Sequence, residues 1–163
     1  MVLYPLYLLK KKNMGKETVI GISFQYTNKF TYIIAKNSNQ GMNVPSFRKK
    51  IRKDLGTLKG EIVYIYFFVD RKINITQEDD IAYIGKSISK EQNTYERFLH
   101  EIYEDNTKKD VAKQYTLTHF YMNDIPLKLE LFFVDGATNL EKQLLTAHKE
   151  MFGYLPIANG KEG

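Results

Sequence analysis

The residues with the most chemical potential in this 163-residue chain are two tyrosines, a lysine, an arginine and a glutamate. Tyr83 and Lys86 lie in the stretch AYIGKS, which follows a very aromatic run, IVYIYFF, that contains Tyr64. Pairing of these two runs would bring the tyrosines together beside glycine, lysine and serine. Further along, Arg97 could hold anionic oxygens bidentately, and Glu141 could ligate a Mg²⁺ ion. We therefore interpret the two runs as the floor of an active site.

The hydrophobic pattern predicts the elements that would position these residues. Continuous apolar or aromatic runs indicate strands, and apolar positions three or four apart indicate helices. In chain order we expect strands at residues 62–70 and 81–86, helices at 94–103 and 108–122, a strand at 127–134 and a helix at 140–152. The first two strands should form an antiparallel hairpin with a long tip. The last helix should end at Gly153.

The first sixty residues predict a hairpin and a helix. Residues 18–26 and 30–36 are rich in β-branched and aromatic types, so we expect two strands joined by a turn at residues 27–29. Pro45 then opens a helix that should end at Gly56. Its apolar stripe recurs every four residues, at Phe47, Ile51 and Leu55.

The same helix has a strongly basic surface. Its cations are Arg48, Lys49, Lys50, Arg52 and Lys53. Such a run is often only a solvated helix face. Five cations on one short element nevertheless favour contact with the phosphates of a nucleic acid. The net charge of +5 points in the same direction.

From residue 62 onward, the order of elements and the residues together resemble the GIY-YIG nucleases. Tyr83-Ile84-Gly85 matches the second family triplet letter for letter, and Ile62-Val63-Tyr64 takes the place of the first. Arg97 matches the family's helix arginine. Glu141 matches the glutamate that opens the last helix, and Asn159 matches the asparagine that often follows. The resemblance covers roughly the last hundred residues.

The chain departs from the family pattern at three points. Ile62 stands where the first triplet has its glycine, and eighteen residues separate Tyr64 from Tyr83, which is more than usual. Arg97 also lies further along than is typical. The two longer spacings are loop insertions, which surfaces tolerate well. They leave open whether Tyr64 or Tyr66 is the first tyrosine.

The resemblance implies an α+β fold with a small central antiparallel three-stranded sheet flanked by helices. It also implies a metal-dependent DNA endonuclease that hydrolyses phosphodiester bonds with Mg²⁺ or Mn²⁺. The implied catalytic residues are Tyr64, Tyr83, Lys86, Arg97, His100, Glu141 and Asn159. Residues 61–163 would form this domain. Residues 1–60 would be an extension for DNA recognition or dimerisation.

Most of these residues have an expected role in phosphodiester hydrolysis, and Arg97 would hold non-bridging phosphate oxygens. Glu141 would hold the metal ion, which stabilises developing charge and the leaving oxygen. Tyr64 would activate the water, as the resemblance implies, while Tyr83 and Lys86 orient water and phosphate. His100, three residues after the helix arginine, shares its side of the helix and could assist.

Three other interpretations remain open. The lost glycine of the first triplet favours a non-catalytic nucleic-acid-binding module on the same fold. A nuclease of another fold would use an Asp/Glu-x-Lys pattern, for which Asp124 and Glu130 have superficially suitable surroundings. The residue two positions after Glu130, however, is Phe132 and not lysine. Glu141 could also serve only in a capping box with Thr138 as the N-cap.

Composition and the N-terminal segment predict where the protein acts. The apolar residues 2–9 are too few for a membrane span of ~20 residues, and lysines follow them, whereas a signal peptide begins with its charges. Met14 could be an alternative start. With no cysteine in the chain, thiolate metal sites and disulfides are excluded. We expect a cytoplasmic, membrane-free enzyme that acts on DNA, as a homodimer or by sequential nicking. Its target sequence, and its role in restriction, repair, homing or a phage, stay open.

Overall fold

The computed structural model describes residues 14–70, 79–88, 94–104 and 112–160, apart from the side chains of residues 94, 95 and 97. The strands are β1 (Gly15–Val19), β2 (Ile22–Tyr26), β3 (Asn28–Ile34), β4 (Ile62–Phe68), β5 (Ile81–Ser87) and β6 (Leu127–Phe133). The helices are α2 (Val44–Leu55), the 3-10 helix η1 (Thr94–His100), α3 (Ala112–Met122) and α4 (Ala137–Phe152). The fold is therefore α+β, as predicted.

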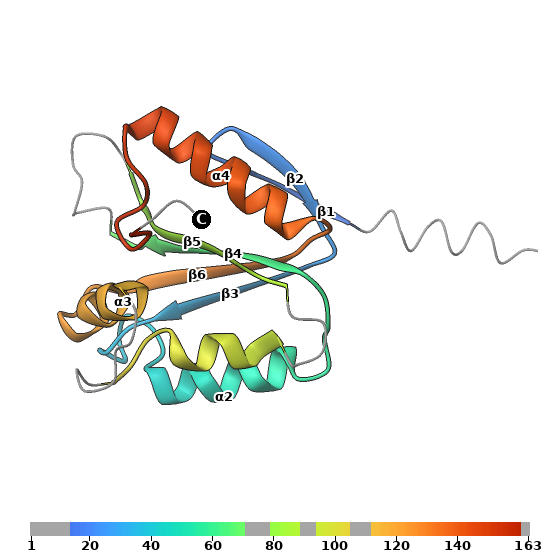
Figure 1. Ribbon diagram of the computed structural model, residues 1–163. Coiled ribbons are helices and arrows are strands. Elements are labelled where there is room, and N and C mark those ends of the chain that lie inside the picture. Colours follow the sequence, from blue (N-terminus) through green and yellow to red (C-terminus); the bar gives the residue numbers. More distant parts are fainter. Residues whose placement is uncertain (1–13, 71–78, 89–93, 105–111, 161–163) are drawn as a thin grey trace, which may run out of the picture.

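The main sheet has four antiparallel strands in the order β3-β6-β4-β5. The helices α2, η1 and α3 cover one face, whereas α4 and the β1–β2 hairpin cover the other (Figure 1). The expectation of three strands is corrected by β3, which pairs with β6 along its whole length, from Asn28 opposite Phe133 to Ile34 opposite Leu127. Residues 28–55 thus belong to the same sheet and the same hydrophobic core as the residues from 62 onward.

The N-terminal hairpin lies earlier than the sequence predicted. Its turn is at Ile20 and Gly21, where both residues have positive φ, 43° and 81°. This is the backbone that tight hairpins require, and glycine adopts it readily. At Thr27 the chain instead passes from one sheet into the other, and the Thr27 N–H donates to the carbonyl of Phe133 at 3.0 Å. Residues 27–29 are therefore not a hairpin turn.

The helices begin and end close to the predicted positions. Asn43 caps α2, because its side-chain oxygen accepts the Ser46 N–H at 2.9 Å, and the predicted apolar stripe is buried. Gly153 ends α4 in the left-handed conformation, φ 85°, and its N–H donates to Lys149 O at 2.8 Å. The predicted helix at 94–103 is a shorter 3-10 helix. Among the described residues, no helix is long and apolar enough to cross a membrane.

The alternation of β4 decides where the candidate site residues lie. Tyr64 and Tyr66 point into the core beneath α2, η1 and α3. Val63 and Ile65 point into the second core, beneath α4. Successive strand residues face opposite sides of a sheet, so neighbours in a motif can end up in different environments.

Candidate functional site

The sheet divides the predicted site residues between its two faces. Tyr83 pairs with Tyr66 in β4 and packs on the tyrosine side. Lys86 pairs with Val63 and therefore faces α4, where Glu141 lies. The structure thus brings Lys86 and Glu141 together, but it separates them from Tyr64 by the thickness of the sheet.

On the tyrosine face, a buried carboxylate that the sequence analysis did not identify organises the site. Glu101 Oε2 accepts the Tyr64 hydroxyl at 2.7 Å, and Glu101 Oε1 accepts the Tyr66 hydroxyl at 3.0 Å. The Lys113 ammonium lies 2.7 Å from Glu101 Oε2. Only 1% of Glu101 is exposed, so its charge is balanced by these three groups rather than by water. We call these four residues the Glu101 cluster.

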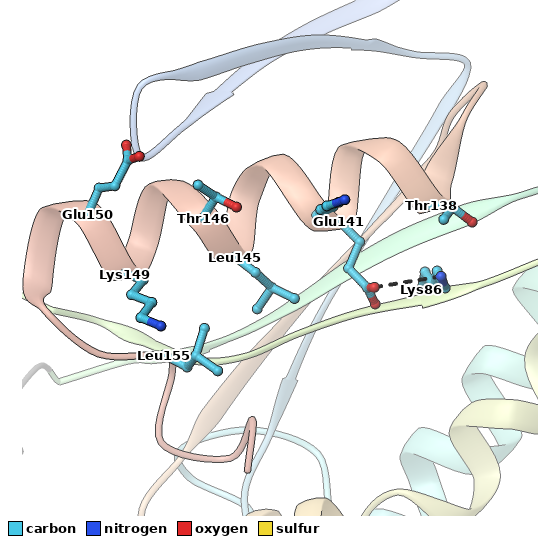
Figure 2. A pocket seen from close by; sticks show the side chains of 9 residues that line it. Lys86, Thr138, Glu141, Leu145, Thr146, Lys149, Glu150 and Leu155 are labelled. Atoms are coloured by element: carbon cyan, nitrogen blue, oxygen red, sulfur yellow. Dashed lines mark ion pairs between the residues drawn. The ribbon is translucent and has the colours of Figure 1, made fainter. Parts of the chain in front are cut away.

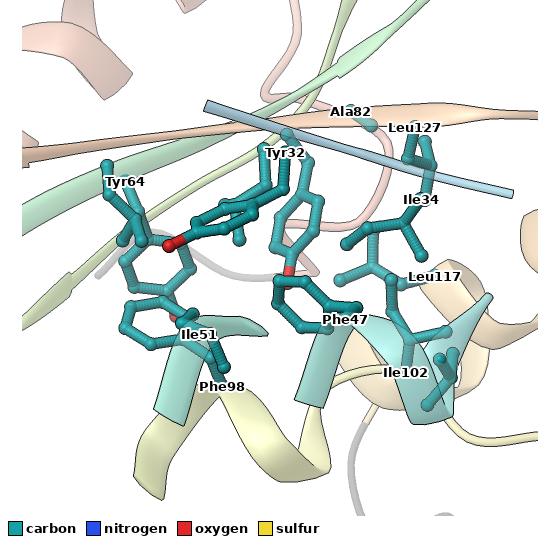
Figure 3. Close-up of a cluster of buried hydrophobic side chains, with 14 of the residues drawn as sticks. Tyr32, Ile34, Phe47, Ile51, Tyr64, Ala82, Phe98, Ile102, Leu117 and Leu127 are labelled. Carbon is teal, nitrogen blue, oxygen red and sulfur yellow. The ribbon is translucent and has the colours of Figure 1, made fainter. Parts of the chain in front are cut away.

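The surroundings of Tyr64 do not fit the expected role in water activation. Tyr64 has no exposed surface, its hydroxyl donates to Glu101, and its ring packs edge-on to Phe98 at 4.8 Å between centroids (Figure 3). Tyr66 shares the same carboxylate. Burial and then the Glu101 charge raise the pKa of Tyr66 well above its ordinary value. Which of the two is the first-triplet tyrosine therefore matters less, because both hydroxyls donate to a buried carboxylate in the core.

Gly85, the glycine of the YIG triplet, has a steric explanation. A Cβ at this position would lie 2.6 Å from Tyr64 Cζ and 2.5 Å from Tyr83 Cε1. The Tyr64 and Tyr83 rings themselves are 5.8 Å apart between centroids. Lys113 lies over the Tyr83 ring at 5.3 Å, which links this ring to the Glu101 cluster. Glycine is thus needed here because two rings occupy the space of a side chain.

On the opposite face, a cavity of about 640 Å³ lies beside α4 (Figure 2). Its lining residues are Lys86, Thr138, Glu141, Lys142, Leu145, Thr146, Lys149, Glu150 and Leu155. Lys86 Nζ lies 3.8 Å from Glu141 Oε1, and the two side chains are 31% and 13% exposed. A partly hydrated lysine and carboxylate, surrounded by further lysines, form a site suited to an anionic ligand.

The start of α4 excludes the capping box that was the alternative role for Glu141. The N-cap is Gly136, φ 73°, which has no side-chain cap, and Thr138 lies inside the helix. The Gly136 N–H instead donates to Glu61 Oε2 at 3.2 Å. Glu141 therefore does not reach back to the N-cap, and its carboxylate points towards Lys86 (Figure 2).

Asn159 completes the edge of β5. Its Oδ1 accepts the Ile84 N–H, and its Nδ2 donates to the Ile84 carbonyl, both at 2.9 Å. The neighbouring Ala158 N–H donates to Ala82 O at 2.9 Å. Asn159 thus holds the YIG strand against the C-terminal segment, which is a positioning role.

The remaining predicted residues whose side chains the structure describes lie away from the cavity. The side chain of Arg97 lies outside the described residues, and His100 is exposed on η1. The basic helix α2 covers the tyrosine face, opposite to α4 (Figure 1). Its Arg48 donates from Nε to Leu99 O at 2.9 Å and from Nη2 to Ile102 O at 3.3 Å, so it fastens η1. Lys50 forms an ion pair with Asp54 at 3.4 Å.

A second buried polar pair joins α4 to the start of β5. His148 Nε2 lies 3.0 Å from Asp79 Oδ1, and His148 Nδ1 lies 2.7 Å from Tyr154 O. Burial alone would raise the pKa of Asp79, but the hydrogen bonds from His148 and the Ile81 N–H, together with the His148 charge, lower it. Asp79 therefore stays ionised, and His148 acts as a core histidine.

The donor set beside α4 fits a hydrated Mg²⁺. Among the described residues, no three histidines, aspartates or glutamates gather into a metal-binding group. Mg²⁺ needs no such group, because it keeps several waters and is commonly held by one or two carboxylates plus substrate phosphate. Glu141, half-buried at the cavity, is a suitable single carboxylate.

No protein-family model matches this chain, and neither a curated protein nor a solved structure matches it. Functional inference therefore depends on the geometry of the site.

Proposed function

We propose that this protein is a metal-dependent endonuclease that hydrolyses phosphodiester bonds of DNA at the cavity beside α4. The observation that carries the proposal is the pairing of Lys86 with Glu141 inside that cavity. These two residues come from distant parts of the chain, and each belongs to a motif of the GIY-YIG resemblance. The lysine-rich lining and the net charge of +5 agree with a polyanionic substrate.

The roles follow from the chemistry of each group. Glu141 holds a Mg²⁺ or Mn²⁺ ion, which when bound supplies charge stabilisation at the scissile phosphate. Lys86 binds a non-bridging phosphate oxygen and offsets negative charge there. Tyr83 packs on the tyrosine face, across the sheet from this cavity, so we assign no step to it. Tyr64 and Asn159 act through the fold.

Replacement of Glu141 with Gln tests the proposal directly. We expect the wild-type protein to nick supercoiled plasmid with Mg²⁺ and not with EDTA, and Glu141→Gln to lose at least about a hundredfold of that rate, because one electrostatic contact to a transition state contributes that much. Glu150→Gln is the matched control, since Glu150 lines the same cavity from the same helix. Equal nicking by the wild-type protein and Glu141→Gln would refute the assignment.

A second candidate function is nucleic-acid binding without cleavage. It is favoured by the sealed position of Tyr64, whose hydroxyl is held by Glu101. A binding module would retain DNA affinity but show no nicking with Mg²⁺ or Mn²⁺, and Glu141→Gln would then leave its affinity unchanged or raise it. The plasmid assay, run beside a DNA-binding assay, separates these two functions.

A further inference from the structure

The cavity beside α4 extends well beyond the pair formed by Lys86 and Glu141. Thr138, Glu141, Leu145 and Lys149 follow one another at steps of three or four residues, and all of them line it. Such spacing places side chains along one side of a helix. In Figure 2, Lys149 lies at the far end of this row from Lys86, and Leu155 lies between Lys149 and Leu145. The cavity is therefore an elongated groove along α4.

The length of this groove exceeds what one phosphate requires. Lys149 lies eight positions after Glu141, which corresponds to about 12 Å along the helix at ~1.5 Å per residue. A strand of duplex DNA advances ~3.4 Å per nucleotide along the helix axis, and an extended unpaired strand advances further, so the groove spans at most about three nucleotides. The volume of about 640 Å³ is that of a small-ligand pocket, which suits part of one strand and not a duplex.

The lining of the groove is charged at both ends and apolar between them, which is the pattern that a nucleic-acid strand would require. The first end carries Lys86 and Glu141, and the far end carries the ammonium of Lys149. Between them lie Leu145, which is buried, and Leu155, which is half-buried. An apolar surface between two cationic positions complements a sugar or base flanked by two phosphates. Glu150 also lines the groove, and its carboxylate points away from Leu155 (Figure 2).

We propose that the α4 groove binds a single strand of nucleic acid over at most about three nucleotides from the cut phosphate, with Lys149 as a positioning residue that contacts a distal phosphate. This inference rests on the proposed function, because it takes Glu141 and Lys86 as the position of the cut. It adds a substrate class: an unpaired strand, such as a frayed end or a locally opened site, enters the groove.

The test is binding of fluorescent oligonucleotides to the full chain in EDTA, followed by anisotropy over a range of salt concentrations. The substrates are a two-nucleotide and an eight-nucleotide single strand, and a duplex of the longer sequence. Lys149→Met should weaken binding of the longer single strand severalfold and lower the slope of log affinity against log salt by about 0.7. It should leave the dinucleotide unaffected, and Lys149→Arg should restore the slope.

Lys36→Met is the matched control, because it removes the same charge from an exposed loop position after β3. Equal losses in Lys149→Met and Lys36→Met would overturn the proposal, as they would report only the total charge. Tighter binding of the duplex than of the single strand would also overturn it. Because binding is measured without metal, these outcomes do not depend on nicking: a protein that cleaves nothing could pass this test, and an active nuclease could fail it.

Discussion

Two carboxylates of this protein each pair with a lysine, one on each face of the main sheet. Glu101 and Lys113, on the tyrosine face, are 2.7 Å apart, with side chains 2% and 16% exposed. Glu141 and Lys86, on the α4 face, are 3.8 Å apart, with side chains 13% and 31% exposed. The same two residue types thus form a closed pair in a core and an open pair at a cavity.

The difference teaches that burial, and not residue type, decides what a carboxylate can do. Glu101 accepts hydrogen bonds from two tyrosines as well as the lysine, so removing it would take a buried partner from three groups at once. Glu141 borders a cavity, where water or a ligand can replace its partner at low cost. The pair of Glu101 and Lys113 therefore has a structural role, whereas the pair of Glu141 and Lys86 is accessible to a ligand.

The largest effect on stability should come from Glu101→Ala. We expect a loss of about 3–5 kcal/mol in the free energy of unfolding, because Lys113 becomes an unpaired, largely buried charge. Urea unfolding followed by circular dichroism measures the loss. Glu104→Ala, on an exposed neighbour, should change little. A loss below about 1 kcal/mol would mean that the Glu101 cluster does not hold the tyrosine face together.

Tyr64→Phe should cost about 1.5–3 kcal/mol, the value of a hydrogen bond to a buried charged group. Nicking per folded molecule should nevertheless stay close to the wild-type rate, because we assign no step to Tyr64. The measurement is plasmid nicking at a temperature where both proteins are folded, with Tyr83→Phe assayed in parallel. A hundredfold loss confined to Tyr64→Phe would return this tyrosine to the catalytic set and weaken the contrast between the faces.

Gly85→Ala should destabilise by about 1–3 kcal/mol, because the new methyl group would overlap the rings of Tyr64 and Tyr83. Gly160→Ala is a fitting control, since its Cβ would meet only the Ala112 Cβ, at an ordinary 3.8 Å. Thermal unfolding of the two variants compares them. Equal melting temperatures would show that the rings of Tyr64 and Tyr83 can move to admit a methyl group, which would contradict tight packing on the tyrosine face.

Local signals in the sequence predicted much of this fold. The apolar stripe of α2 and the glycine after α4 are short-range features, and the structure confirms both. The hairpin turn was misplaced because Ile20, a β-branched residue, rarely adopts a positive φ and gives no turn signal. The pairing of β3 with β6 joins segments about a hundred residues apart, and no local pattern reports such a contact.

The candidate site was predictable only in part, and for the same reason. Lys86 and Glu141 were recognised from their motifs, and the structure brings them together. Glu101 was missed because an isolated glutamate between a histidine and an isoleucine reads as a solvated residue. Its burial depends on Tyr64 and Lys113, which come from other elements. The division of the site between two faces follows from register, which the motifs do not specify.

Asp79→Asn should give a smaller loss at neutral pH, because Asn can still accept a hydrogen bond from His148. The pKa of Asp79 is lowered from 3.8 in the folded protein, so its ionised form stabilises the fold above that value. The contribution is lost as the pH falls through the folded pKa. The difference in unfolding free energy between wild type and Asp79→Asn should therefore shrink in acid. A difference that grows below pH 3.8 would contradict this sign.

The smallest effect on stability should come from Glu141→Gln, the change expected to affect nicking most. We expect less than about 1 kcal/mol, because a 3.8 Å pair at a cavity is weakly coupled and screened by salt. Urea unfolding at low and high salt measures it, and the small difference from wild type should vanish at high salt. A loss above about 2 kcal/mol that salt does not reduce would place Glu141 with Glu101 as a structural carboxylate. The α4 face would then be as closed as the tyrosine face. Glu141 could bind a metal ion only by giving up a contact that stabilises the fold.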